Sequence, residues 1–183
     1  MFVLRDAISP DACARLRAAI DRSALTPAEI FADGFRVDTA VRRSCEAEVD
    51  PNSIADVTRL LAGIRPRVSS FFAIPLSASE GPGFLRYVEG GFYASHRDVA
   101  GEAPLEFPRR ISVVLFLTTN GSGVGCCQGG ALRLYMPRGD ETEPVPVDIP
   151  PTAGTLIAFP ATWLHEVLPV VAGVRDVVVD WFY

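Results

Sequence analysis

Two histidines, His96 and His165, are the only imidazole side chains in the chain. His96 lies at the end of a strand-like run and is followed two residues later by Asp98. On a strand, residues two apart project from the same face, so His96 and Asp98 point together while Arg97 points away. A third ligand from a neighbouring strand would complete a facial set of two imidazoles and one carboxylate, and His165 is left to supply it. Such a set leaves positions open on a bound metal and suits the chemistry of Fe(II) with dioxygen.

Two other interpretations of these residues stay open, because the H-x-D motif is short. Both histidines could be hydrogen-bonded residues of the fold with no metal between them. Two imidazoles and one carboxylate can also hold zinc with one open position.

An arginine near the C-terminus bears on this choice. Strand alternation divides the run into a face with Arg175, Val177, Val179 and Trp181 and a face with Asp176, Val178 and Asp180. The first face is typical of an interior, which would bury the arginine unless an anion pairs with it. Its planar guanidinium suits a terminal carboxylate held through two hydrogen bonds, and an interior salt bridge is the alternative. A zinc hydrolase has no need of such an anchor beside the metal.

A predicted hairpin links this arginine to the histidine upstream. It joins a strand over His165–Val170 to a strand over Val174–Phe182 through a turn at Val171–Gly173. In that register Arg175 lies about four residues along the hairpin from the histidine, and Trp181 returns to the level of the histidine. Trp181 is therefore predicted to form a wall of the metal site.

The elements that must position these residues fall into two parts. In the N-terminal part, Ser9 is a candidate cap for a helix that continues to about Ser23. A second helix is predicted from Ser53, which Pro66 should end or kink, with a further turn reaching Phe72. Residues 26–52 are mixed in character.

From Phe84 onward, short apolar or alternating runs are separated by Gly, Pro and Asn. The expected strands are Phe84–Val88, Phe92–His96, Arg110–Leu117, Ala131–Met136, Val145–Ile149, Thr155–Phe159, His165–Val170 and Val174–Phe182. Eight such strands predict a mainly β fold, an antiparallel sandwich or barrel with both helices packed on one sheet. We expect one domain over residues 1–183, with a helical part at 1–80 and the β core at 84–183.

Composition excludes several classes of protein. The net charge of −5 argues against non-specific nucleic-acid binding, and no apolar run is long enough for a membrane helix. All seventeen basic residues are arginine, which excludes a Schiff-base or P-loop lysine. The four cysteines, Cys13, Cys45, Cys126 and Cys127, form no C-x-x-C pair and are expected to be free thiols. With no signal-peptide pattern at the N-terminus, a cytoplasmic protein is expected.

An ordered set of motifs now points to a family. The motifs are Arg86–Gly91, His96–Asp98, Arg110–Leu117, Gly129–Leu132, Gly154–Pro160 and His165–Arg175 with Trp181. Over residues 84–183 the chain resembles the prolyl 4-hydroxylase-like branch of the 2-oxoglutarate- and Fe(II)-dependent oxygenases. The resemblance implies a double-stranded β-helix, or jelly roll, with N-terminal helices that buttress one sheet.

The resemblance also implies roles for individual residues. His96, Asp98 and His165 would bind iron, and Arg175 would bind the far carboxylate of 2-oxoglutarate. Tyr87 matches a tyrosine that donates a hydrogen bond near that cosubstrate. Phe116 departs from the family, because many relatives have a tyrosine there, and Thr155 is a candidate to supply the missing hydrogen bond.

The implied cofactors are Fe(II), 2-oxoglutarate and O2, with ascorbate as a candidate reductant. Asp98 favours hydroxylation, because related halogenases lack this carboxylate. A compact chain suggests a small-molecule substrate, such as an amino acid or a natural-product precursor. The alternatives are a protein hydroxylase acting on a prolyl or other side chain and, in a different class, a non-catalytic or zinc-binding jelly roll. The loop Val99–Arg109 is a candidate substrate lid.

Overall fold

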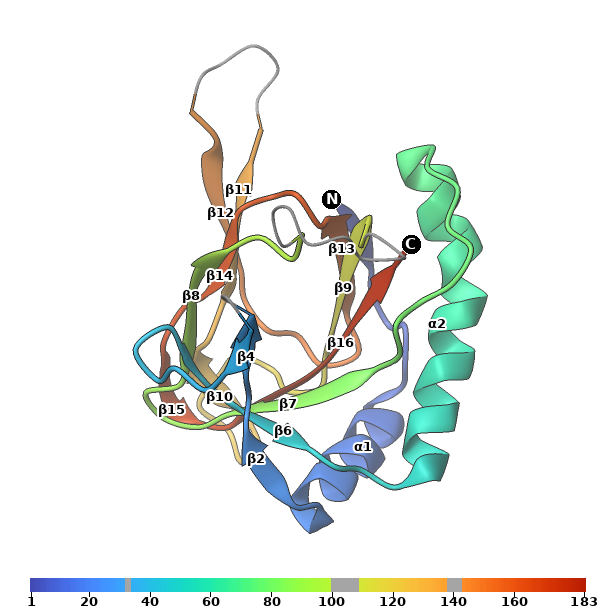
Figure 1. The fold of residues 1–183 in the computed structure, drawn as a ribbon. Coiled ribbons are helices and arrows are strands. Elements are labelled where there is room, and N and C mark those ends of the chain that lie inside the picture. The colour runs from blue at the N-terminus through green and yellow to red at the C-terminus, as the bar shows by residue number, and fades with distance from the viewer. Residues whose placement is uncertain (32–33, 100–108, 138–142) are drawn as a thin grey trace.

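Two antiparallel sheets face each other, and two helices cover the outside of the larger one (Figure 1). The computed structural model describes residues 1–31, 34–99, 109–137 and 143–183. The larger sheet contains, in spatial order, β1 (Phe2–Leu4), β13 (Leu156–Pro160), β9 (Ile111–Phe116), β16 (Arg175–Phe182), β7 (Gly83–Tyr87), β6 (Cys45–Ala47) and β2 (Leu25–Pro27). The smaller sheet contains β12 (Val145–Ile149), β11 (Leu132–Met136), β14 (His165–Val167), β8 (Phe92–His96) and β5 (Arg42–Arg43). The predicted mainly β jelly roll is confirmed.

Two short strand pairs complete the β structure. One consists of β10 (Cys127–Gly129) and β15 (Val170–Gly173), and the other of β3 (Ile30–Phe31) and β4 (Phe35–Arg36). Strands β2, β5 and β6 come from the segment that the sequence left without an assignment, and they extend both sheets. The N-terminal part is therefore not simply helical.

The core has two layers, because strands of the larger sheet bury both faces. Helix α1 (Pro10–Arg22) and helix α2 (Pro51–Phe72) pack on one face, against side chains such as Val113, Leu115 and Val178. The other face meets the smaller sheet through side chains such as Val114, Phe116 and Val177. The packing of both helices on one sheet is as predicted. Among the described residues, no helix has the length and apolar character needed to cross a membrane.

The start of α1 and the end of α2 at Phe72 agree with the prediction, whereas the start of α2 and the effect of Pro66 do not. Ser9 caps α1 by accepting a hydrogen bond from the backbone N–H of Ala12. Helix α2 begins at Pro51, capped by Asp50, and not at Ser53. Pro66 does not end it, and the helix continues to Phe72.

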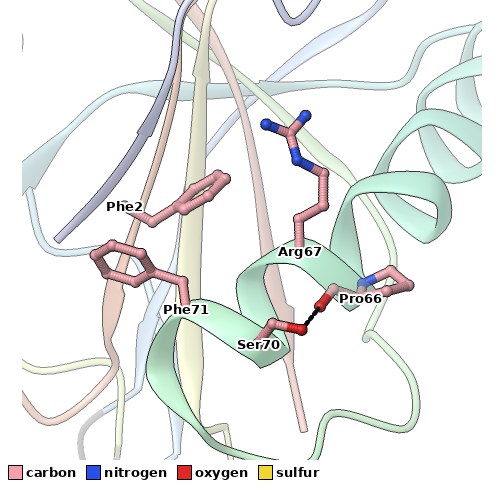
Figure 2. Close-up of a pocket in the computed structure, with 5 residues that line it drawn as sticks. All are labelled: Phe2, Pro66, Arg67, Ser70 and Phe71. Atoms are coloured by element: carbon pink, nitrogen blue, oxygen red, sulfur yellow. Dashed lines mark hydrogen bonds between the residues drawn. The ribbon is translucent and has the colours of Figure 1, made fainter.

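Pro66 is tolerated because it lies on the solvent side of α2. The ring removes one backbone donor, and the carbonyl that it leaves without a partner belongs to exposed Ala62, which water can reach. Figure 2 shows Ser70 Oγ donating a hydrogen bond to the Pro66 carbonyl one turn later. The surface hollow drawn there, between α2 and Phe2 of β1, lies in the helical layer and not between the sheets.

The predicted C-terminal hairpin is wrong. Strand β14 ends at Val167, and residues Val171–Gly173, which were expected to be a turn, lie in strand β15, which pairs with β10. The last strand, β16, lies in the larger sheet between β7 and β9, not beside β14. The chain changes sheets here for two reasons. Pro169 has no backbone N–H to continue the strand pairing. Gly173 has φ of +76° and lies so close to Cys126 that an added Cβ atom would be 2.4 Å from the Cys126 carbonyl oxygen, so the chain can turn there only at a glycine.

Candidate metal centre

The two histidines meet across one antiparallel pair of the smaller sheet. His96 ends β8 and is the direct Cα partner of His165, which begins β14. Asp98 follows β8 by two residues, and its backbone N–H donates to the carbonyl of Ala161. The Asp98 oxygens lie 3.6 Å from His96 Nε2 and 3.4 Å from His165 Nε2. One ligand atom from each of the three residues lies within 4.8 Å of the others, so they could share a single ion.

Both imidazole rings are oriented for ligation by their Nε2 atoms. His96 Nδ1 lies 2.9 Å from the carbonyl oxygen of Ala94, and His165 Nδ1 lies 3.0 Å from that of Trp163. A carbonyl only accepts, so each Nδ1 carries the proton and each Nε2 keeps its lone pair for a metal. This outer hydrogen bond is the one that usually fixes a metal-binding histidine.

The electrostatics of the cluster favour a metal-binding protonation state. Burial alone would raise the pKa of Asp98, but the charge that His96 and His165 carry when protonated, together with the hydroxyl of Ser112, holds it below its usual value. Burial also lowers the pKa of His165, despite the opposing charge of Asp98. A carboxylate and a neutral imidazole are the forms that ligate a cation. The arrangement therefore fits a divalent metal with two nitrogen ligands and one oxygen ligand.

Tyr93 is a residue of this site that sequence reasoning missed. Its ring stacks on His96, with centroids 3.6 Å apart and an interplanar angle of 19°. Regular alternation would put residues three apart on opposite faces of β8. In β14 the two paired residues, His165 and Val167, are two positions apart, whereas their partners in β8, His96 and Tyr93, are three positions apart. The extra residue forms a β-bulge in β8, which turns both rings to the same side. No pattern in the sequence marks this bulge.

Arg175 is buried in the interior between the sheets, and no carboxylate of the described chain pairs with it. It is 1% exposed, and neither Nε nor Nη1 has a hydrogen-bond partner among the described residues. Its guanidinium carbon lies 4.8 Å from the centre of the Tyr87 ring and 5.5 Å from that of Phe116. The alternative of an interior salt bridge is therefore not supported, since the described part of the chain offers this arginine no carboxylate at bonding distance.

A glycine makes room for this side chain. At Gly130 a Cβ atom would lie 2.7 Å from Cδ of Arg175, and the backbone there has φ of +65°. Any other residue would therefore push the arginine aside and strain the turn.

The other residues predicted for the site also face this interior. Tyr87 is 2% exposed and is the Cα partner of Arg175. Thr155 directly precedes β13 and is two positions from Ile157, so strand alternation places it on the same inner face. Trp181 is the Cα partner of Ser112, which contacts Asp98. Tyr87 thus lies at the level of the arginine, and Trp181 lies at the level of the residue that contacts Asp98.

Arg97 and the predicted lid complete the list. The Arg97 side chain is exposed and donates to the carbonyl of Thr162, in keeping with a side chain that points away from the ligands. Residues 100–108, which make up nearly all of the Val99–Arg109 loop, lie outside the described part of the chain.

Comparison with known families agrees with this geometry. The family model of the 2OG-Fe(II) oxygenase superfamily matches residues 82–183, which include all three candidate ligands and Arg175. The chain belongs to this superfamily.

Individual relatives of this oxygenase domain are hydroxylases by name. A PKHD-type hydroxylase of Rippkaea orientalis is 37% identical over 99 residues, which are 54% of this chain and 40% of the relative. A PKHD-type hydroxylase of Parvibaculum lavamentivorans is 28% identical over 177 residues, which are 96% of this chain and 74% of the relative. The chain spans about two fifths of the length of the first curated relatives that it matches.

Solved structures share the fold over nearly the whole chain. A prolyl-4-hydroxylase of Pseudomonas putida has a TM-score of 0.76 at 23% identity and matches 99% of this chain and 90% of its own. A prolyl hydroxylase of Trichoplax adhaerens, in complex with a peptide fragment of hypoxia inducible factor, has a TM-score of 0.77 at 18% identity. That match covers 100% of this chain and 82% of the neighbour.

Proposed function

We propose that the chain is a 2-oxoglutarate- and Fe(II)-dependent dioxygenase that hydroxylates an unactivated C–H bond. One observation carries this function: a fully buried arginine that has no anionic partner among the described residues lies in the same interior as a two-histidine, one-carboxylate cluster. Burying a charge is costly unless a counter-ion compensates for it, so a ligand carboxylate is the expected partner of Arg175. A zinc hydrolase or a non-catalytic metal-binding barrel leaves this charge unexplained.

The chain's own residues would divide the work as follows. His96, Asp98 and His165 hold Fe(II), and Arg175 grips the far carboxylate of 2-oxoglutarate through its planar fork. Bound Fe(II), 2-oxoglutarate and O2 supply the oxidising chemistry, in which the cosubstrate is converted to succinate and carbon dioxide.

The walls of the interior serve to bind and to exclude water. Tyr87 and Thr155 offer hydroxyl groups along the path of the cosubstrate. The Phe159 ring lies edge-on to His165 at 4.8 Å and, with Trp181, shields the metal ligands. A dry pocket of this kind strengthens the electrostatic contacts and confines a reactive oxidant.

The substrate that we favour is a small molecule with a carboxylate, such as an amino acid. Arg42 lies 4.8 Å above the Tyr93 ring, which itself stacks on His96. Arg42 donates hydrogen bonds to the hydroxyl of Ser44 and to the backbone carbonyl of Glu29, which are both neutral. No carboxylate of the described residues pairs with it. A guanidinium beside the ring that stacks on His96 suits an anionic group of the substrate.

A second candidate is a peptide containing proline. The two structural neighbours described above are prolyl hydroxylases by name, and one of them is bound to a peptide. Assays that monitor succinate release with free amino acids and with proline-containing peptides separate the two substrate classes, and a mass gain of one oxygen atom identifies the product.

Anaerobic spectroscopy tests the core of the proposal. Addition of Fe(II) and then 2-oxoglutarate to the metal-free protein is expected to produce a weak visible charge-transfer band. Arg175→Ala should lose the band at cosubstrate concentrations that saturate the wild type. Arg59→Ala, which removes an exposed arginine paired with Asp56 on α2, is the matched control and should keep it. Stoichiometric iron binding with no band in the wild type would contradict the proposal.

A further inference from the structure

A serine hydroxyl holds one oxygen of the candidate metal-binding carboxylate. Ser112 Oγ donates a hydrogen bond of 2.5 Å to Oδ2 of Asp98. The serine is 2% exposed, so the bond is shielded from solvent. Hydrogen bonds from a hydroxyl to an ionised oxygen are among the stronger ones in proteins, and this length lies at their short end.

The fold gives Ser112 a fixed place. It is the second residue of β9, between its Cα partners Phe159 on β13 and Trp181 on β16. The other inward side chains of β9 are Val114 and Phe116, both apolar. Buried hydroxyl groups are almost always hydrogen-bonded, and the partner of Ser112 in this otherwise apolar row is Asp98.

The bond constrains how Asp98 can meet a metal. Oδ1 lies 3.6 Å from His96 Nε2, and Oδ2, the oxygen that Ser112 holds, lies 3.4 Å from His165 Nε2. A carboxylate that is free to rotate could offer both oxygens to one ion, and a second Asp oxygen would occupy a further coordination position. That position is one that cosubstrate or dioxygen requires in a facial site.

We infer that Ser112 is a positioning residue that restricts Asp98 to one metal-binding oxygen and thereby keeps the remaining coordination positions open. This inference rests on the proposed iron site. Ser112 touches neither substrate nor metal in this role, because it acts through the carboxylate alone. A hydroxyl that merely satisfied a buried acceptor would affect folding but not the coordination of the ion.

The test uses a pair of variants of equal size. Ser112→Thr keeps the hydroxyl, whereas Ser112→Val replaces it with a methyl group of nearly the same volume. Ser112→Ala is added as the smaller deletion. Thr118→Val is the control, because it removes another buried hydroxyl, one that accepts from the backbone N–H of Asp176.

The probe is Co(II), whose visible spectrum reports the coordination number, added to metal-free protein without cosubstrate. Loss of an outer-shell hydrogen bond typically weakens metal binding about 10- to 100-fold. We expect Ser112→Val and Ser112→Ala to raise the Co(II) dissociation constant by that factor and to change the spectrum. Ser112→Thr and Thr118→Val should match the wild type within a few-fold. Thermal unfolding of each metal-free variant verifies that it is folded.

Two failures can be told apart. If Ser112→Val binds Co(II) with the affinity and spectrum of Ser112→Thr, the inference is overturned while the proposed iron site stands. If the wild type itself gives no charge-transfer band with Fe(II) and 2-oxoglutarate, the proposed function fails first.

Discussion

At the scale of single residues, the site combines groups that are each costly in a protein interior. Arg175 is buried with no counter-ion in the described part of the chain, and Asp98 is largely buried beside two imidazoles. A protein tolerates such residues when a ligand completes them, because binding supplies the missing partner. The same interior also contains Tyr87, whose ring packs against the guanidinium of Arg175.

Tyr87→Phe should weaken 2-oxoglutarate binding without loss of iron. The substitution removes a hydroxyl expected to donate to the cosubstrate, and a hydrogen bond to a charged group is worth about 1.5–3 kcal/mol. Titration of the charge-transfer band should therefore show a dissociation constant roughly ten- to a hundredfold higher. Tyr135→Phe, which removes a hydroxyl bonded to Glu166 on β14, is the matched control and should leave the titration unchanged.

Asp180 provides a pH-dependent prediction that does not involve the metal site. Burial raises the pKa of this carboxyl, although the backbone N–H groups of Trp181 and Gly81 oppose the shift. Its folded-state pKa thus exceeds the unfolded value of about 3.9, so its ionised form destabilises the folded state. The cost is absent below the unfolded pKa, grows as pH rises through the folded pKa, and then stays constant.

Asp180→Asn cannot ionise, and it should gain stability relative to the wild type as pH rises. We expect the unfolding free energy of Asp180→Asn minus that of the wild type to increase by about 1 kcal/mol between pH 4 and pH 8, as for other buried unpaired polar groups. Urea unfolding at several pH values measures it. Exposed Asp56→Asn is the control, and a pH-independent difference for Asp180→Asn would count against the argument.

At the scale of elements, the larger sheet serves two purposes. Its outer face packs against α1 and α2, and its inner face carries Arg175, Ser112 and Trp181 toward the smaller sheet. The smaller sheet supplies both histidines through the β8–β14 pair. The helices thus stabilise the sheet without approaching the chemistry.

Leu61→Ala should therefore lower stability and leave metal binding unchanged. Leu61 lies on the inner face of α2 at 1% exposure, and deletion of a buried leucine typically costs about 2–5 kcal/mol. Chemical denaturation should show this loss, while the Co(II) dissociation constant stays as in the wild type. Ile54→Ala, on the same helix at 40% exposure, should change stability by about 0.5 kcal/mol at most. A large loss of metal affinity in Leu61→Ala would mean that the helical layer shapes the site.

At the scale of the whole molecule, the ligands come from segments far apart in the chain. His96 and His165 are brought together by the smaller sheet, and Arg175 approaches the same interior from the larger one. A ligand that contacts both sheets would connect the two layers. Metal and cosubstrate should therefore stabilise the folded protein as a unit.

Thermal unfolding should show this linkage. At a concentration 100 times its dissociation constant, a ligand that binds only the folded state adds about 2.7 kcal/mol. For a chain of this size each kcal/mol raises Tm by about 2–4 °C, so metal with 2-oxoglutarate should raise Tm by roughly 5–11 °C. A chelator should reverse the shift. His165→Ala should abolish it, and an equal shift in that variant would place the metal elsewhere.

The sequence by itself determined the class of fold and which residues are candidates for the chemistry. His96 and Asp98 are two apart, His165 is the only other histidine, and a lone arginine interrupts an apolar face. These are properties of residue type and of the two-residue period of a strand, which depend on local geometry alone. The cap at Ser9 and most strand positions follow from similarly local rules.

Only the tertiary structure decided which strands pair and which side chains meet. Local pattern suggested a hairpin from His165 to Trp181, but Pro169 and Gly173 direct the chain into the other sheet. The bulge that stacks Tyr93 on His96 and the bond from Ser112 to Asp98 depend on pairings between distant segments. Register across a sheet is set by the packing of the whole core, and no window of sequence contains that information.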